Sequence, residues 1–277
     1  MLNILTLNTA NYDDHPGWLD RLGFIAHTIL KAGANVVGLT EVRYTSSNPF
    51  NTYATQYWKN QKVTPPADPA SMGDQILALL NAWDINNTWT LLTNQAEVYS
   101  PNSWEGLSIL TSLSTSSPGV FDIPSEDGNK RITQYVTLTT GGGNSVTLYN
   151  THFALDAASR VGDAQAIVNQ IGTYTQTEFF AIIGDLNAEP SDPAIEVFTS
   201  AGYTDTWTQQ HSGDDGFTFA APNLVKRIDY VWTSPGLAGQ AESISIVPSL
   251  DTVDGYAEHG TVFASDHLGL CATFNVS

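Results

Sequence analysis

The sequence predicts an α/β fold in which two β-sheets pack face to face and helices cover their outer surfaces. Three observations lead to this prediction. Short apolar segments of strand length alternate with segments of helical period along the chain. The chain opens with a strand, a helix and a second strand. Its 277 residues contain no sequence repeat and no composition break that would mark a linker. We therefore expect one domain that spans residues 1–277.

The first third of the chain predicts a strand–helix–strand unit and then an irregular excursion. Residues 2–8 and 36–40 are short and apolar, as buried strands are. Between them, residues 18–33 carry apolar side chains at helical spacing. Residues 44–71 are polar, aromatic and proline-containing, so we expect irregular structure there, before a helix at 74–83. The irregular segment is a candidate for substrate selection.

The middle of the chain predicts a meander of antiparallel strands. Residues 141–144, Gly-Gly-Gly-Asn, form a strong hairpin turn signal between two strand-like stretches. The strands expected in this region are 89–92, 108–113, 132–140 and 145–153. After them, helices are expected at 159–171 and 192–200, the second with Asp192 as N-cap and Pro193 in its first turn. The remaining expected strands are 179–183, 228–233, 243–247 and 268–276.

The charge balance is strongly acidic. Asp and Glu number 28 against 10 Lys and Arg, a net charge of -18, which repels polyanions and disfavours long nucleic acid as a partner. Solubility explains this charge equally well. Strand character begins at Leu2 and leaves no room for a signal peptide, and the apolar runs are far too short for a membrane span. We expect a soluble protein, cytoplasmic or secreted, with a monomer favoured.

Polar residues of a few chemical kinds follow the apolar strands. The amide of Asn8 and the carboxylate of Glu41 come at the ends of the first two strands, and Asp266 precedes the last one. Phosphoester hydrolysis needs a hard cation, a base that activates water, and donors for the phosphate oxygens. Mg²⁺, or Mn²⁺ in its place, prefers oxygen ligands of this kind. Any one of these residues alone is ordinary capping or solvation, but together they predict a metal-assisted site for phosphoester cleavage.

The base and the phosphate-binding groups are expected on other strands. Asp266 and His267 are neighbours and face opposite ways on a strand, so Asp229 is the better candidate to orient His267 as a general base. Asp185 and Asn187 can point the same way on an extended segment, where they would position water and phosphate. Further candidates are His152, with Glu105 to hold it, and the basic pairs Lys130-Arg131 and Lys226-Arg227.

The ordered motifs resemble those of the endonuclease/exonuclease/phosphatase superfamily, also called DNase I-like. They are Thr6-Leu7-Asn8, Thr40-Glu41-Val42, Glu105-Gly106-Leu107-Ser108-Ile109, Thr151-His152-Phe153, Gly184-Asp185-Leu186-Asn187, Arg227-Ile228-Asp229-Tyr230 and Ser265-Asp266-His267. The resemblance implies a four-layer α/β sandwich with two mixed sheets and a Mg²⁺-dependent phosphoesterase site at one end. It also implies residue roles. Asn8, Glu41 and Asp266 would form the metal group, Asp185 and Asn187 would position water and phosphate, and His267 with Asp229 would be the base. His152, partnered by Glu105, and Arg131 would bind phosphate.

The substrate is left open among three hypotheses. The resemblance favours a phosphodiesterase of small or lipid-derived substrates over a nuclease that grips DNA through Arg131 and Lys226-Arg227. A catalytically silent binding protein is disfavoured because every expected polar position is filled. Residues 49–58, with Phe50, Tyr53, Tyr57 and Trp58, are a candidate for peripheral membrane contact, although a folded surface loop is favoured there. The single cysteine, Cys271, is expected to be a buried small hydrophobe.

Overall fold

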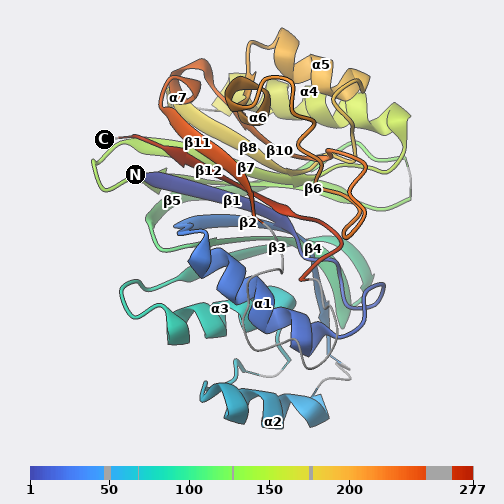
Figure 1. Cartoon of the computed structure of the whole chain (residues 1–277). Helices are drawn as coiled ribbons and strands as arrows, with labels where there is room; N and C mark the ends of the chain where they lie inside the picture. Colours follow the sequence, from blue (N-terminus) through green and yellow to red (C-terminus); the bar gives the residue numbers. More distant parts are fainter. Residues whose placement is uncertain (47–50, 68, 127, 175–176, 248–263, 277) are drawn as a thin grey trace.

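Two six-stranded mixed sheets form the centre of the computed structural model (Figure 1). It describes residues 1–46, 51–67, 69–126, 128–174, 177–247 and 264–276. The first sheet has the order β11 (Ala241–Val247), β12 (Gly269–Phe274), β1 (Leu2–Asn8), β2 (Val36–Thr45), β4 (Ser103–Thr111), β3 (Thr90–Ser100). The second has the order β5 (Ser114–Ile123), β6 (Arg131–Thr139), β7 (Ser145–His152), β8 (Phe179–Asp185), β10 (Asp229–Thr233), β9 (Thr204–Asp205).

Helices cover the outer face of each sheet, which gives the four expected layers (Figure 1). On the side of the first sheet lie α1 (Trp18–Lys31) and α3 (Met72–Trp83), with α2 (Asn51–Gln61) beyond them at the bottom of the view. On the side of the second sheet lie α4 (Ala157–Tyr174), α5 (Pro193–Ser200), α6 (Thr206–Gln210) and α7 (Pro235–Ala238). No helix in the described part of the chain has the length and apolar character needed to cross a bilayer. The observed architecture is the sandwich that the sequence predicts.

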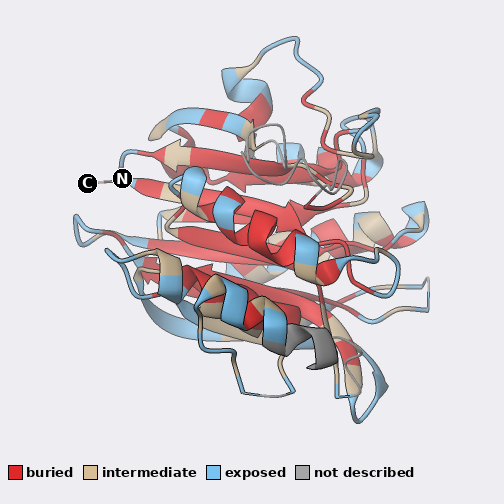
Figure 2. Ribbon diagram, turned by 60° about the horizontal axis from the view of Figure 1, so that its bottom comes forward, coloured by how far each residue is buried: buried red, intermediate tan, exposed pale blue. Residues whose placement is uncertain are grey.

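The sheets are buried because both of their faces are covered. Figure 2 shows buried strands along the centre and helices whose outward faces are exposed. Between the sheets, apolar residues such as Ile4 and Val36 belong to one core cluster with Leu148 and Ile183 of the other sheet. The sheets approach closely at Gly38, where an added Cβ would lie 2.4 Å from Ile183 Cδ1. Glycine at this position therefore leaves room for the side chains of the facing sheet.

Several helix and strand boundaries agree with the sequence. Asp192 caps α5 by accepting from the Ala194 amide, and Pro193 stands in the first turn, as predicted. The turn between β6 and β7 is closed by the amide of Gly143, which donates to the Thr140 carbonyl and has a φ of 84°. Such a positive φ suits glycine because a side chain there would be strained. Cys271 is buried, as expected.

The irregular segment predicted at 44–71 was wrong in part. Strand β2 continues to Thr45, and residues 51–61 form α2, whose sequence carries too few apolar residues to show a clear helical period. Trp58 is buried in the core with α1 and α3, and Tyr57 is half-buried against it. Trp58 is therefore part of the core and not a membrane anchor, while Phe50 and the side chain of Tyr53 lie outside the described residues.

The strands expected at 89–92 and 108–113 were too short, and two strands, β5 and the two-residue β9, were not expected. The two expected stretches are the ends of a long hairpin, β3 with β4, that runs from Thr90 to Thr111. Strand β5 pairs with β6 at the edge of its sheet, where its Ser-rich, proline-containing sequence is largely exposed. Edge strands tolerate proline and polar residues because one side of their backbone needs no partner. Their polarity hides them from a search for apolar runs.

Candidate functional site

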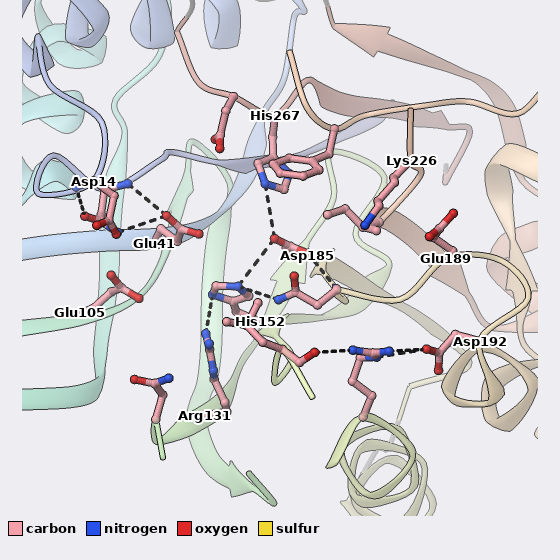
Figure 3. Close-up of a pocket in the computed structure, with 18 of the residues that line it drawn as sticks. Asp14, Glu41, Glu105, Arg131, His152, Asp185, Glu189, Asp192, Lys226 and His267 are labelled. Carbon is pink, nitrogen blue, oxygen red and sulfur yellow. Dashed lines mark hydrogen bonds and ion pairs between the residues drawn. The ribbon is translucent and has the colours of Figure 1, made fainter. Parts of the chain in front are cut away.

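Most of the predicted residues line one cavity where the two sheets end, and Asn8 and Asp229 contact residues of its wall. Register pairs His152 with Asp185 across β7 and β8, and Asp185 with Asp229 across β8 and β10. Asn8 ends β1 in the other sheet, and its amide reaches Asp185. The cavity has a volume of about 670 Å³, within the range of small-molecule sites. Figure 3 shows Glu41, Glu105, Arg131, His152, Asp185 and His267 around it.

A β-bulge aims Glu41 into the cavity. The register of β2 against β4 shifts between Leu39 and Val42, and Glu41 has a φ of 55°, a left-handed conformation uncommon for a residue with a side chain. The Asn150 amide crosses from β7 and donates to the carbonyls of Leu39 and Ser108, at 3.1 and 3.2 Å. The sequence placed Glu41 at a strand end, whereas β2 runs on through the bulge to Thr45.

Asn8 lies between two of the carboxylates. Its Nδ2 donates to Glu41 Oε1 at 2.9 Å and to Asp185 Oδ2 at 3.0 Å. Its Oδ1 accepts from the Ala10 amide at 2.9 Å, which fixes the orientation of the side chain. The positive end of the amide dipole therefore occupies the position between two acidic groups, where a cation would also be stabilised.

His267 and Asp229 form the predicted pair. Asp229 Oδ2 lies 2.9 Å from His267 Nδ1, and both side chains are buried. Burial lowers the pKa of His267, but the carboxylates of Asp229 and Asp185 outweigh burial and raise this pKa to about 10. The ring of Phe219 packs on the imidazole at a centroid distance of 4.7 Å. Asp229 thus orients the ring with Nε2 toward Asp185, and the two carboxylates favour its protonated form.

Asp185 stands between two histidines (Figure 3). Its Oδ2 is 3.7 Å from His267 Nε2 and 3.6 Å from His152 Nε2. Burial raises the pKa of Asp185, although His267 acts against the rise. Its other oxygen, Oδ1, accepts from the Asn187 amide at 2.8 Å. The Asp185 carboxylate thus lies beside both imidazoles and also accepts from the side-chain amide of Asn8.

The segment from Gly184 to Asn187 is extended only in its first half, because β8 ends at Asp185 and Asn187 has a left-handed φ of 47°, whereas the sequence predicted an extended segment. The Asn187 side chain donates to the Phe153 carbonyl at 3.0 Å and lies 3.2 Å from His152 Nε2, the ring nitrogen that Asp185 also approaches. Gly184 has a φ of 138°, and a Cβ there would lie 1.8 Å from the Thr151 carbonyl oxygen. Glycine is required at this position because β7 and β8 approach so closely.

His152 has different partners from the expected one. Arg131 Nη1 lies 2.9 Å from Nδ1, and Asn187 Nδ2 lies 3.2 Å from Nε2, so both ring nitrogens face N–H groups. Burial, Arg131 and His267 hold the pKa of His152 well below its usual value. The ring is therefore neutral here. Arg131 takes the place expected for Glu105, whose own pKa is raised to about 7 by burial and by the charge of Glu41.

Asp266 lines the same cavity but does not join the cluster around Asn8. Its Oδ2 contacts His15 Nε2 at 3.2 Å, and a quarter of its side chain is exposed. Residues 265–267 precede β12, so the alternation of a strand does not apply to them. His15 lies in the loop between β1 and α1 and was not singled out in the sequence.

The donor set fits a hard divalent cation. Glu41, His152 and Asp185 offer ligand atoms that all lie within 4.8 Å of one another, and two of the three are carboxylates. Burial and the negative charge of Glu41 raise the pKa of nearby Glu105. A bound cation would neutralise this charge and polarise a phosphoryl oxygen. Glu41 and Asp185 would hold it, with the Asn8 amide beside them.

The basic residues divide into those that face the cavity and those that do not. Arg131 and Lys226 line it. Arg227 is buried outside it, paired with Asp205 and stacked over Tyr230, so it cannot grip a substrate as the sequence suggested. Lys130 pairs with Asp122 on the surface. Phe219 was not predicted from the sequence. It contacts His267 because an isolated β-bridge pairs these two residues, which are distant in sequence.

The comparisons with known proteins agree with the geometry. A family model described as the endonuclease/exonuclease/phosphatase family matches residues 5–267. No functionally curated protein matches the chain in sequence. Among solved structures, an endonuclease/exonuclease/phosphatase family protein from Leptotrichia buccalis is 17% identical with a TM-score of 0.75, over 99% of this chain and 100% of that one.

Two further structures share the fold. The catalytic domain of human Nocturnin with bound sulfate is 15% identical, with a TM-score of 0.64 over 99% of this chain and 93% of that chain. D. rerio TDP2 complexed with a single-strand DNA product is 14% identical, with a TM-score of 0.65 over 99% and 98%. At these identities the likeness concerns the fold alone. With the match over nearly its whole length, the chain belongs to the endonuclease/exonuclease/phosphatase family, whose members are metal-dependent phosphoester hydrolases.

Proposed function

We propose that the protein is a Mg²⁺-dependent phosphodiesterase that acts on a small or lipid-derived phosphodiester. The observation that carries the proposal is that Glu41, Asp185 and His267 line one cavity, with Asn8 bonded to both carboxylates and Asp229 bonded to the imidazole behind it. A volume of about 670 Å³ suits a substrate of limited size. The net charge of -18 disfavours long polyanions.

In this proposal Asp185 and His267 prepare the water that attacks phosphorus. Asp229 orients His267 so that Nε2 faces Asp185 and the cavity. The imidazole can accept a proton from water once the carboxylate of Asp185 is neutralised, because that charge helps to hold the ring's proton. The base role of His267 therefore depends on what binds at Asp185.

On the other side of the cavity, Arg131, His152 and Asn187 are assigned to the phosphate. Arg131 carries a fixed positive charge, and its guanidinium contacts the neutral ring of His152. A phosphate oxygen that accepts from Arg131 and Asn187 would be held within reach of Asp185, since His152 touches all three groups. Asp266, beside His15, is assigned to the metal environment, and Glu105 to the carboxylates beside Glu41.

The test compares hydrolysis of bis-p-nitrophenyl phosphate with that of p-nitrophenyl phosphate, in Mg²⁺ and in EDTA. We expect metal-dependent cleavage of the diester. Its rate should fall by about 100-fold or more in His267→Ala and in Glu41→Ala, because each substitution removes a group assigned to the attack. Circular dichroism checks that both variants are folded. Full activity in either folded variant, or undiminished cleavage in EDTA, would contradict the proposal. Mn²⁺ in place of Mg²⁺ tests the choice of metal.

An endonuclease is the second candidate. Arg131 and Lys226 both line the cavity, so a strand could be gripped locally despite the net charge. The similar fold of D. rerio TDP2 was solved with a single-strand DNA product. Plasmid nicking that collapses with added salt, and that is lost in Lys226→Ala, would favour this candidate, because phosphate contacts make binding salt-dependent. A catalytically silent binder would cleave neither substrate.

A further inference from the structure

The loop of residues 9–15 touches both carboxylates that the sequence assigned to the metal. Asn11 donates to Glu41 Oε2 from its backbone amide at 3.1 Å and from its side chain at 3.3 Å. At the other end of the loop, His15 Nε2 contacts Asp266 Oδ2 at 3.2 Å. The position of this loop therefore determines how Glu41 and Asp266 are held. The loop follows Asn8 directly and contains Ala10 in a left-handed conformation, with a φ of 50°.

Arg21 holds the loop in place from α1. Its Nη1 donates to the carbonyls of Thr9 and Ala264, at 2.8 and 2.9 Å. Its Nη2 donates to the carbonyls of Ala10 and His15, at 2.7 and 3.0 Å. One guanidinium thus gathers four backbone carbonyls, three from the loop and one from the residue before Ser265-Asp266-His267. Segments from the two ends of the chain meet on this side chain.

The charge of Arg21 also acts on the site. The side chain is 4% exposed, and burial lowers its pKa to about 10, while the carboxylates of Asp266 and Glu41 oppose the change. All four of the hydrogen bonds described above go to neutral carbonyl oxygens. A buried cation is costly unless its hydrogen bonds are satisfied and its charge is balanced, so this position restricts the choice of residue.

We propose that Arg21 is a positioning residue of the metal site: it fixes residues 9–15 and Ala264, through Asn11 it sets Glu41 for cation binding, and through His15 it holds Asp266 at the wall of the cavity. The inference rests on the proposed function. Lysine cannot replace it, because an ammonium group is a single point with three donors, whereas the two Nη groups of a planar guanidinium reach four acceptors at once.

The test measures Mg²⁺ and Mn²⁺ binding by calorimetry without substrate, and then kcat and KM for the diester across a range of Mg²⁺ concentrations. For Arg21→Lys and Arg21→Gln we expect a dissociation constant for the metal raised about tenfold or more, a lower kcat, and a KM at saturating Mg²⁺ within about twofold of wild type. A merely structural role would lower the melting temperature and leave metal affinity unchanged in the folded protein. Arg227→Lys is the matched control, since Arg227 is buried to the same degree but lies outside the cavity. Its metal affinity should equal that of wild type.

Each outcome bears on a different statement. Wild-type protein that binds no divalent cation contradicts the proposed function itself. Wild-type metal affinity and kcat in folded Arg21→Lys overturn the inference and leave the proposed function intact. If neither Arg21 variant folds, Asn11→Ala tests the same path, because it keeps Arg21 and removes the side-chain contact between the loop and Glu41. Unchanged metal affinity in Asn11→Ala would then overturn the inference.

Discussion

Replacing Asp229 with asparagine tests the electrostatic role of the buried pair. Asparagine keeps the shape of the side chain, and its oxygen can still accept from His267 Nδ1, so the substitution removes mainly the charge. The centres of the two charges are about 4 Å apart, and at an effective dielectric constant of about 20 an opposite charge at that distance is worth about 4 kcal/mol. That energy corresponds to a fall of about 3 in the pKa of the His267 ring. The ring pKa in wild type is raised to about 10, so Asp229→Asn should bring it near neutrality.

Two measurements check this prediction. NMR titration of the His267 ring in EDTA gives its pKa directly, and we expect the fall just described. The value of kcat/KM for the diester in Mg²⁺ should fall about 10²-fold or more, because the imidazole loses the group that orients it and stabilises its proton. Asp205→Asn serves as control, since Asp205 is in a buried ion pair outside the cavity. The reasoning is refuted if folded Asp229→Asn keeps the wild-type ring pKa and cleaves the diester within threefold of the wild-type rate.

Three other predictions concern the fold and the charge of the site. Gly184→Ala should lower the free energy of unfolding by about 3 kcal/mol or more, because its Cβ would lie 1.8 Å from the Thr151 oxygen, whereas Gly141→Ala, with open space around it, should change little in urea denaturation. Burial and Glu41 raise the pKa of Glu105 from 4.5 to about 7, so the folded protein holds this proton more tightly than the unfolded chain does. The resulting contribution to folding stability is complete below pH 4.5 and is lost as the pH rises through about 7. In EDTA above about pH 7, the free energy of unfolding of Glu105→Gln should therefore exceed that of wild type by up to about 3 kcal/mol. Equal free energies of unfolding at every pH would contradict the raised pKa of Glu105. Burial raises the pKa of Cys271 to about 11, so the native protein should react with a thiol reagent far more slowly at neutral pH than the urea-unfolded chain; equal rates would show that the thiol is accessible.

The sequence predicted the fold where local patterns were strong. Apolar strands such as 2–8 and 179–183 and the capped helix at Pro193 were predictable, because their periodicity and capping residues are local signals. The exposed edge strand β5 and the helix α2 were not, because neither has the apolar stripe on which such predictions depend. For these elements, pairing or packing with distant segments overrides a weak local preference.

The site was predictable as a set of residues and not as a set of contacts. The predicted pairing of His267 with Asp229 agrees with the geometry, although the strand alternation from which it was argued does not apply to residues 265–267. The partner of His152 could not be inferred, because Arg131 and Glu105 are both near it in the cavity and only their orientations distinguish them. In the same way, only the structure separates Lys226, which faces the cavity, from buried Arg227.

By itself, the sequence determined the class of chemistry: the order and kinds of its polar motifs specify a phosphoester hydrolase, because few reactions require amide, carboxylate and imidazole groups at so many strand ends. Tertiary structure decided how those groups act. A bulge turns Glu41 inward, a left-handed residue turns Asn187 toward His152, and Arg21 joins the loop after β1 to the segment before His267. These contacts join residues far apart in sequence, so no local pattern encodes them, and only the packing of the two sheets brings them within hydrogen-bond distance.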